Sequence, residues 1–173
     1  IILAHPNLAE STINRYLLDC ADFGSGVLIN DLYKNYRNFE IDIKKEQLLL
    51  QQADVVVLQF PFYWYSSPAL LKEWQDKVLT RGFAYGPGGD ALKGKELQIV
   101  ITSGGGESEY IAGGVNQYTY SELLRPLQAT ANMLGMKYLA PYCIGDVYSL
   151  DQHALEVQAA HYRQRIIELT LNK

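Results

Sequence analysis

Short runs of apolar and β-branched residues alternate along this chain with segments of helical periodicity. The runs lie at residues 1–4, 27–29, 55–60, 97–102 and 138–144. Each run is mainly apolar instead of alternating between apolar and polar residues, which is typical of strands that helices cover on both faces of a parallel sheet. The sequence therefore predicts the α/β class, with a doubly wound sheet of five parallel strands and helices on both faces.

Four of the intervening segments carry an apolar stripe at helical spacing. Ser11 is a candidate N-cap for the first of them, and Pro68 stands at a first helical position after Ser67. Ser149 and Gln152 match a capping box. The stripes consist of Ile13, Leu17 and Cys20; Leu71, Trp74 and Val78; Leu123, Leu127, Ala131 and Leu134; and Leu155, Ala159, Tyr162, Ile166 and Leu169.

The size and composition fit a single domain over residues 1–173. The chain is 48% hydrophobic and 20% charged, and no linker or repeat divides it. Residues 82–94 contain five glycines and one proline, which predicts a long loop before the fourth strand. The longest apolar stretches, such as residues 54–60, fall far short of the roughly 20 residues of a membrane-spanning helix.

The charge and the cysteine content indicate which kind of partner the protein binds and in which cellular compartment it works. A net charge of -4 argues against nucleic-acid binding, which needs clustered Lys and Arg. Cys20 and Cys143 form no CxxC motif and sit among apolar neighbours, so we expect reduced core residues. The first residues lack the pattern of a secretory signal. We therefore expect a cytoplasmic protein whose partner is a small molecule or another protein.

Two motifs that suggest other chemistry fail on geometry. Residues 89–96 match most of a phosphate-binding Walker A loop, but no Ser or Thr follows the lysine and the segment precedes a strand. His153 and His161 would lie about 12 Å apart along a helix axis, too far to share a metal ion. No G-x-S-x-G elbow is present either. We expect neither nucleotide hydrolysis, a metal site nor a serine hydrolase.

Polar donors gather after the first strand. Five strands joined by helices suit a flavodoxin-like sheet, in which ligands bind beyond the carboxyl ends of the strands. There Ser11, Thr12 and Asn14 stand at a helix start with free N–H groups, while His5 offers a further donor or a positive charge. This predicts a site for a phosphate monoester. An ordinary N-cap beside a surface histidine is the alternative, and the absence of GxGxxG disfavours a dinucleotide held by a Rossmann turn.

Aromatic residues and glycines follow the next two strands. After Pro61 come four consecutive aromatic residues, 62–65, and residues 102–105 end in two glycines. Rings suit a planar ligand, and glycines let backbone N–H groups approach its edge. Core packing and a tight turn are the alternatives. Together with the phosphate site these loops predict a pocket for flavin mononucleotide (FMN), with FAD less expected because only one anion site is offered.

Five stretches carry a resemblance that spans nearly the whole chain. The sequence resembles the flavodoxin-like NAD(P)H:quinone oxidoreductases, and within them the Kef-type ancillary flavoproteins of glutathione-gated potassium efflux. The stretches are AHPNLAESTIN at 4–14, DLYKNYRNFEIDI at 31–43, QFPFYWYSSPALLKEWQDKVLTRGFAYGPGGDALKGK at 59–95, TSGGGESEY at 102–110 and LRPLQATA at 124–131.

The resemblance implies a role for each loop. The first loop would hold the flavin phosphate and ribityl chain, the second would flank the isoalloxazine ring, and the third would line its polar edge. Tyr110 matches a tyrosine beside the flavin, which makes it the candidate catalytic residue. Tyr110 and Asn116 are the candidate substrate-binding residues, although the larger quinone reductases have a histidine where this chain has Asn116. The candidate cofactor-binding residues are His5, Ser11, Thr12, Ile13, Asn14, Pro61, Phe62, Tyr63, Trp64, Tyr65, Thr102, Ser103, Gly104 and Gly105.

The resemblance also implies an activity and partners. NAD(P)H would be the co-substrate, giving a hydride that passes through the flavin to a quinone. A homodimer is implied, with residues 83–85 supplying part of the wall opposite the flavin. The alternative function is a regulatory binding module that docks on a potassium efflux antiporter at the inner face of the cell membrane and activates it, with redox activity incidental.

Overall fold

The computed structural model describes residues 1–19, 23–24 and 26–171. Its sheet has the strand order β2-β1-β3-β4-β5, and every strand pair is parallel. This confirms the predicted doubly wound α/β fold. The strands are β1 (Ile2–Leu3), β2 (Asn30–Asp31), β3 (Val55–Pro61) and β4 (Glu96–Thr102), with β5 (Lys137–Tyr138) and β6 (Tyr142–Ile144) both pairing with β4 at the fifth position.

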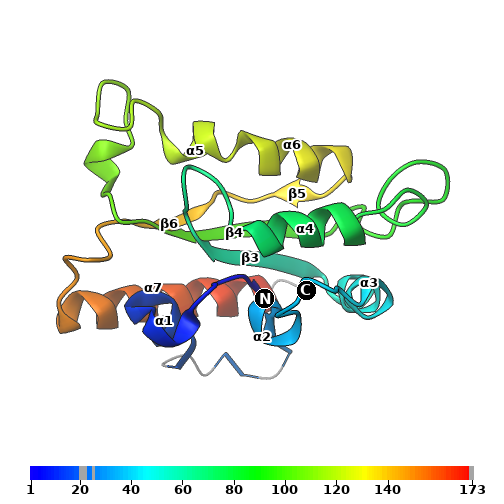
Figure 1. The fold of residues 1–173 in the computed structure, drawn as a ribbon, viewed down its shortest axis with the longest axis horizontal. Coiled ribbons are helices and arrows are strands. Elements are labelled where there is room, and N and C mark those ends of the chain that lie inside the picture. Colours follow the sequence, from blue (N-terminus) through cyan, green and yellow to red (C-terminus); the bar gives the residue numbers. More distant parts are fainter. Residues whose placement is uncertain (20–22, 25, 172–173) are drawn as a thin grey trace.

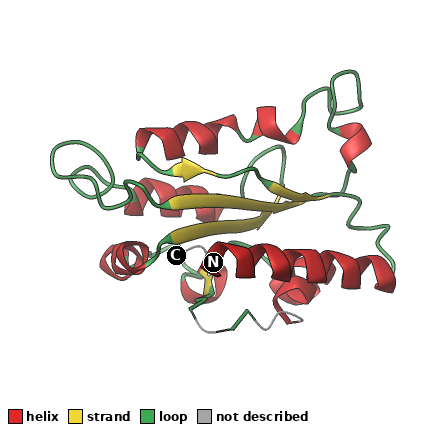
Figure 2. Ribbon diagram, turned by 180° about the vertical axis from the view of Figure 1, so that it is seen from behind, coloured by secondary structure: helices red, strands yellow, loops and turns green. Residues whose placement is uncertain are grey.

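Helices cover both faces of this sheet, which is why its central strands are mainly apolar and the few polar side chains in them, such as Gln59 and Gln98, are buried. Helices α1 and α7 pack on one face, and Figure 2 shows the long α7 running beside the strands. Helices α4, α5 and α6 pack on the other face, and Figure 1 shows α5 and α6 on the opposite side of the strands from α1 and α7. Helices α2 and α3 contribute to the same core as α4, α5 and α6. The helices are α1 (Thr12–Asp19), α2 (Leu32–Asn35), α3 (Ile43–Gln52), α4 (Ala69–Val78), α5 (Tyr120–Leu123), α6 (Arg125–Met133) and α7 (Gln152–Leu171).

The second strand lies after the predicted residues 27–29, so that prediction is wrong in position. The strand is Asn30–Asp31, and the N–H of Asn30 donates to the carbonyl of Ile1 at 2.7 Å. Leu28 and Ile29 are exposed instead of lying within the sheet. Because β1 pairs through only two residues, it holds no more than two residues of its outer neighbour.

The fifth strand is interrupted, whereas one continuous strand over residues 138–144 was expected. Paired residue numbers differ by 41 at Glu96 and Lys137 but by 42 at Val100 and Tyr142, so one extra residue is inserted between them. Pro141 in this bulge has no N–H for the ladder. The side chain of Gln98 donates to the free carbonyl of Ala140 at 2.8 Å instead.

Helix starts follow the sequence only in part. The hydroxyl of Ser11 accepts the N–H of Asn14, as expected of an N-cap. Pro68 is not the first helical residue, since it occupies the cap position before Ala69. The capping box of Ser149 and Gln152 is also wrong. Asp151 caps α7 by accepting from Ala154 at 2.8 Å, and a capping box occurs instead at Thr119 and Glu122.

The apolar stripe at residues 123–134 and the two cysteines remain to be compared with the sequence predictions. The stripe of residues 123–134 is divided between α5 and α6, because Pro126 stands in the first turn of α6. Cys143 is a half-buried free thiol packed against the core, and burial raises its pKa to about 12. Cys20, the other cysteine and a member of the first stripe, lies outside the described residues.

A buried carboxylate ties three helices to the edge of the sheet. Glu46 on α3 is 1% exposed and accepts from Asn30 Nδ2 at 2.7 Å, Tyr36 Oη at 2.7 Å and Trp74 Nε1 at 2.8 Å. These donors come from β2, the residue that ends α2, and α4. A buried charge is tolerated where hydrogen bonds satisfy it, so this cluster fixes how α2, α3 and α4 meet.

We predict that Glu46→Leu lowers the free energy of unfolding by at least about 2 kcal/mol, because a buried donor left without its acceptor costs about 1–3 kcal/mol. Urea unfolding measures this. Gln51→Leu, at an exposed position of the same helix, is the control and should change stability by less than about 0.5 kcal/mol. Equal effects of the two substitutions would contradict the assignment.

Candidate functional site

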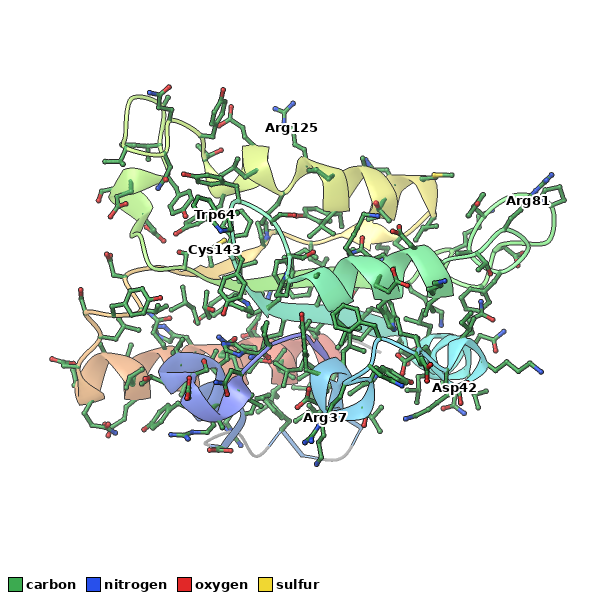
Figure 3. All side chains as sticks on the ribbon, viewed as in Figure 1. Arg37, Asp42, Trp64, Arg81, Arg125 and Cys143 are labelled. Atoms are coloured by element: carbon green, nitrogen blue, oxygen red, sulfur yellow. The ribbon has the colours of Figure 1, made fainter. Side chains whose placement is uncertain are left out.

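The loops that follow β1, β3 and β4 meet at one edge of the sheet. Pro61 stands opposite Thr102, so β3 and β4 end at the same level. The N–H of Phe62 donates to the carbonyl of Thr102 at 2.7 Å, and that of Ser103 donates to Ile144 at 2.9 Å. Figure 3 shows Trp64 and Cys143 at this end of the molecule and Arg81 at the opposite end. The expected convergence of the three loops is therefore present in the fold.

The loop after β1 presents an open helix start. Ser11 is buried at the beginning of α1, and its hydroxyl accepts the N–H of Asn14 at 3.1 Å. The N–H groups of Thr12 and Ile13 have no acceptor within a helix, and no hydrogen bond among the described residues uses them. An anion is the natural partner of two such donors at the positive end of a helix.

Asn14 points into the protein instead of out of the helix start. Its side-chain N–H groups donate to Thr102 Oγ1 at 2.9 Å and to Ser11 Oγ at 3.3 Å. Its oxygen accepts from Gln59, whose own oxygen accepts from Tyr162 at 2.6 Å. With 1% exposure, Asn14 ties the start of α1 to β3 and β4. Its contribution to the site is to fix where the open N–H groups of α1 lie.

His5 is a neutral donor in this environment. Its Nδ1 accepts the N–H of Asn7 at 3.1 Å, which leaves the proton on Nε2. The residue is 8% exposed, and burial lowers its pKa below the usual 6.5, with the charge of Asp31 opposing the shift. Of the two roles that the sequence leaves open for His5, the donor is favoured over the positive charge.

The aromatic loop after β3 forms a strained hairpin. Tyr63 and Ser66 exchange backbone hydrogen bonds of 3.0 and 2.9 Å, with Trp64 and Tyr65 as the two turn residues. Their φ angles are 48° and 62°, the left-handed pair of a type I′ turn that normally selects Asn and Gly. Bulky side chains are rare in this conformation, and such strain concentrates at functional sites.

The rings of this hairpin are not core residues, except for Phe62. Phe62 packs in the core, but Tyr63 and Tyr65 are 45% and 47% exposed and Trp64 is 93% exposed. For these three side chains the core alternative is wrong. Three exposed rings at consecutive positions of one hairpin form a candidate contact surface for a ligand or a second molecule.

The glycines after β4 allow close packing and leave donors open. A Cβ on Gly104 would lie 2.8 Å from the ring of Tyr148, and one on Gly105 would lie 2.7 Å from the carboxylate of Glu109. One on Gly106 would overlap the carboxylate of Asp146. The N–H groups of Gly104 and Gly105 take part in no hydrogen bond among the described residues. These N–H groups are available to the polar edge of a ligand.

Tyr110 lies at the junction of the second and third loops. It is 8% exposed, its ring centroid lies 6.1 Å from that of Phe62, and it stacks on Tyr120 at 4.0 Å. Within the described part of the chain its hydroxyl makes no hydrogen bond. Burial raises its pKa above the usual 10, so the phenol keeps its proton near neutral pH. Tyr110 therefore offers one unused donor at the site.

Asn116 joins the same assembly through Tyr65. The hydroxyl of Tyr65 donates to Asn116 Oδ1 at 3.1 Å, which links the aromatic hairpin to the segment after Tyr110. The amide N–H groups of Asn116 remain open within the described residues and can donate, but an amide does not exchange protons near neutral pH. Asn116 can orient a substrate here without acting as a general acid.

Sequence reasoning missed Tyr148. This side chain is 91% exposed and its ring lies against Gly104, in the loop after β6. Ligands of such sheets bind beyond the carboxyl ends of the strands, and this applies to the loop after the fifth strand position as well as to the loops after β1, β3 and β4. An aromatic residue soon after residue 144 was a signal that could have been used.

Residues 83–85 do not reach the site of their own chain. They follow α4 and precede β4, so they lie at the amino ends of the strands. Arg81, which shortly precedes them in the sequence, lies far from Trp64 in Figure 3. A cavity of about 390 Å³ is at that end too, lined largely by apolar residues such as Ile1, Val55 and Leu169.

Over the described residues there is no cluster of three metal-ligating side chains, and none of the helices is both long and apolar enough to cross a membrane.

Comparison with known proteins identifies the family. Residues 1–166 match the model of the family described as having a flavodoxin-like fold. The chain belongs to this flavodoxin-like family. It is 46% identical over 168 residues, which cover 97% of this chain and 94% of the relative, to the glutathione-regulated potassium-efflux system ancillary protein KefF of Klebsiella pneumoniae.

Two solved structures of this family are similar over nearly their whole length. General stress protein 14 of Treponema denticola, solved in complex with FMN, is 34% identical with a TM-score of 0.93 over 97% of each chain. An NADPH-quinone reductase from P. pentosaceus is 38% identical with a TM-score of 0.87 over 95% of each chain. The predicted resemblance to flavodoxin-like quinone oxidoreductases and Kef-type proteins is confirmed.

We predict that Trp64→Asn raises the free energy of unfolding by about 1 kcal/mol, because a left-handed conformation costs a bulky residue about 1–2 kcal/mol and asparagine much less. Chemical denaturation of the ligand-free protein measures this. Val115→Asn removes another exposed apolar side chain without a positive φ, and should leave stability unchanged. A loss of stability in Trp64→Asn would show that the turn is not strained.

Proposed function

We propose that this protein is an FMN-dependent NAD(P)H:quinone oxidoreductase. The observation that carries the proposal is a set of unused donors along one edge of the sheet, beside an exposed aromatic hairpin. The donors are the N–H groups of Thr12, Ile13, Gly104 and Gly105 and the hydroxyl of Tyr110. The FMN complex and the NADPH-quinone reductase among its similar structures support this reading.

The residues present fit the three parts of FMN. The start of α1 offers N–H donors to one phosphate group, and His5 adds a neutral donor beside it. Tyr63, Trp64 and Tyr65 present rings that have no place in the core. The glycine loop offers N–H donors to a polar ring edge. A single helix start favours the monophosphate cofactor over FAD, whose second phosphate would need a partner of its own.

The protein's own part in the reaction is to bind, orient and stabilise charge. FMN, when bound, supplies a carrier that accepts a hydride from NAD(P)H and gives it to a quinone. The N–H groups of Gly104 and Gly105 would donate to the polar edge of the bound ring, and fixed donors of this kind stabilise negative charge best where water is excluded. The Tyr110 hydroxyl adds a donor that stays protonated. Asn116 orients the substrate.

We also propose a homodimer, and the position of residues 83–85 is consistent with it. In one protomer they are at the opposite end of α4 from Trp64, so only the loop of a second copy can face the exposed hairpin. Tyr85 is 36% exposed on that loop. A two-fold arrangement would cover Trp64 of each copy with the loop of the other, since such an interface uses the same surface twice.

The second partner that we propose is a potassium efflux antiporter. The observation that favours it is the 46% sequence identity between this chain and KefF. Docking on the antiporter would place the protein at the inner face of the membrane. Activation of the antiporter by a variant without quinone turnover would identify the regulatory module as the main function. Loss of activation together with turnover would favour the enzyme.

The test of the proposed function uses the purified protein. We expect heat to release a cofactor that co-chromatographs with FMN, and NAD(P)H oxidation to depend on added quinone with ping-pong kinetics, because both substrates use one site in turn. Recovery of FAD from protein made with both flavins available would contradict the cofactor assignment. Bound FMN without quinone-dependent turnover would contradict the activity.

We predict that Tyr110→Phe slows flavin reduction by NAD(P)H by about ten- to a few hundredfold with little effect on FMN binding, because one charge-stabilising donor is lost. Stopped-flow bleaching of the flavin measures the rate. Tyr118→Phe is the matched control, since Tyr118 is 57% exposed in the same segment. Wild-type speed in Tyr110→Phe would leave this tyrosine a packing role only.

A further inference from the structure

Tyr120 contacts both groups that line the proposed flavin edge. It begins α5 and is 8% exposed. Its ring stacks on that of Tyr110 with centroids 4.0 Å apart and planes 22° apart, and the ring of Phe62 meets it edge-on at 6.1 Å. Removing the Tyr120 ring would therefore leave one face of Tyr110 without support.

The hydroxyl of Tyr120 reaches the glycine loop. It lies 2.6 Å from Ser103 Oγ and donates to the carbonyl of Gly105 at 3.1 Å. Because Tyr120 gives its one hydroxyl proton to this carbonyl, Ser103 donates to the Tyr120 oxygen, and Ser103 Oγ lies 2.9 Å from the same carbonyl. The N–H of Asp146 also donates to the carbonyl, at 3.3 Å. The Gly105 carbonyl is thus held by the hydrogen-bonded pair of Tyr120 and Ser103 and by the N–H of Asp146, which fixes the course of the segment that carries the open N–H groups of Gly104 and Gly105.

The hydroxyl of Tyr120 is closely surrounded by neighbouring backbone. A Cβ on Gly145 would lie 3.2 Å from the Tyr120 hydroxyl, so the oxygen is enclosed on that side as well. Burial is the main cause that raises the pKa of Tyr120 to about 12. The phenol therefore remains a donor over the range in which enzymes of this kind are assayed.

We propose that Tyr120 is a positioning residue. Its hydroxyl sets the glycine loop and its ring sets Tyr110, so the N–H and phenol donors face one ring edge together. The inference rests on the proposed flavin-binding function and deepens it. Tyr120 itself does not touch the reacting atoms, because its hydroxyl is occupied by Ser103 and Gly105.

Tyr120→Phe tests the proposal because it keeps the stacked ring and removes the hydroxyl. A neutral hydrogen bond contributes about 0.5–1.5 kcal/mol, so we expect the FMN dissociation constant to rise about two- to twelvefold. Riboflavin affinity should fall by the same factor, since the change is at the ring edge and not at the phosphate. The midpoint potential of the bound flavin should become more negative, because the donors favour the reduced, negatively charged ring.

Two further variants make the result specific. Tyr142→Phe removes a hydroxyl bonded to Gln158 away from the site, and should leave the affinity and the potential unchanged. Ser103→Ala should reproduce the shifts of Tyr120→Phe, and the double variant should add little, because both act on one carbonyl.

The outcomes separate this inference from the proposed function. Wild-type protein that binds FMN, together with unchanged affinity and potential in Tyr120→Phe, would overturn the positioning role alone. An equal shift in Tyr142→Phe would overturn it too, since the effect would then be a general loss of stability. Wild-type protein that binds no flavin would overturn both the function and this inference.

Discussion

The parallel pairing of β3 with β4 is the constraint on which the site depends. Seven consecutive residue pairs fix the register, and the last pair sets Pro61 opposite Thr102. The aromatic hairpin and the glycine loop must then leave the sheet side by side. A slip of this register would separate them and would also turn the strand side chains toward the wrong face. The relative placement of the two loops is thus a property of the sheet.

A buried chain of polar groups adds the third loop to this pair. Asn14 bonds to Thr102 on β4 and to Gln59 on β3, and Gln59 bonds to Tyr162 on α7. Because buried polar groups are costly unless paired, the start of α1 has one well-satisfied position. Among the described residues, every buried side-chain nitrogen and oxygen has a hydrogen-bond partner, whereas the N–H groups of Thr12, Ile13, Gly104 and Gly105 at the sheet edge have none. That contrast is what makes the edge a candidate binding site.

The sequence predicted the fold class and three loops of the site, because apolar runs, helix stripes and the strand-end rule are local signals. It failed where partners distant in sequence decide. The strand at residues 27–29 is displaced because β1 is short, and the fifth strand is broken where Gln98 satisfies a carbonyl in the bulge. The inward role of Asn14 depends on Thr102, 88 residues away, and no local pattern contains that bond.

The central claim is that these loops hold FMN through its phosphate and its ring together. Titration of the cofactor-free protein with FMN and with riboflavin tests it most directly, with quenching of flavin fluorescence as the readout. Because charge-assisted hydrogen bonds contribute about 1.5–3 kcal/mol each, FMN should bind at least about tenfold more tightly than riboflavin. Equal affinities would contradict the phosphate site at the start of α1, and the absence of binding by either flavin would contradict the account as a whole.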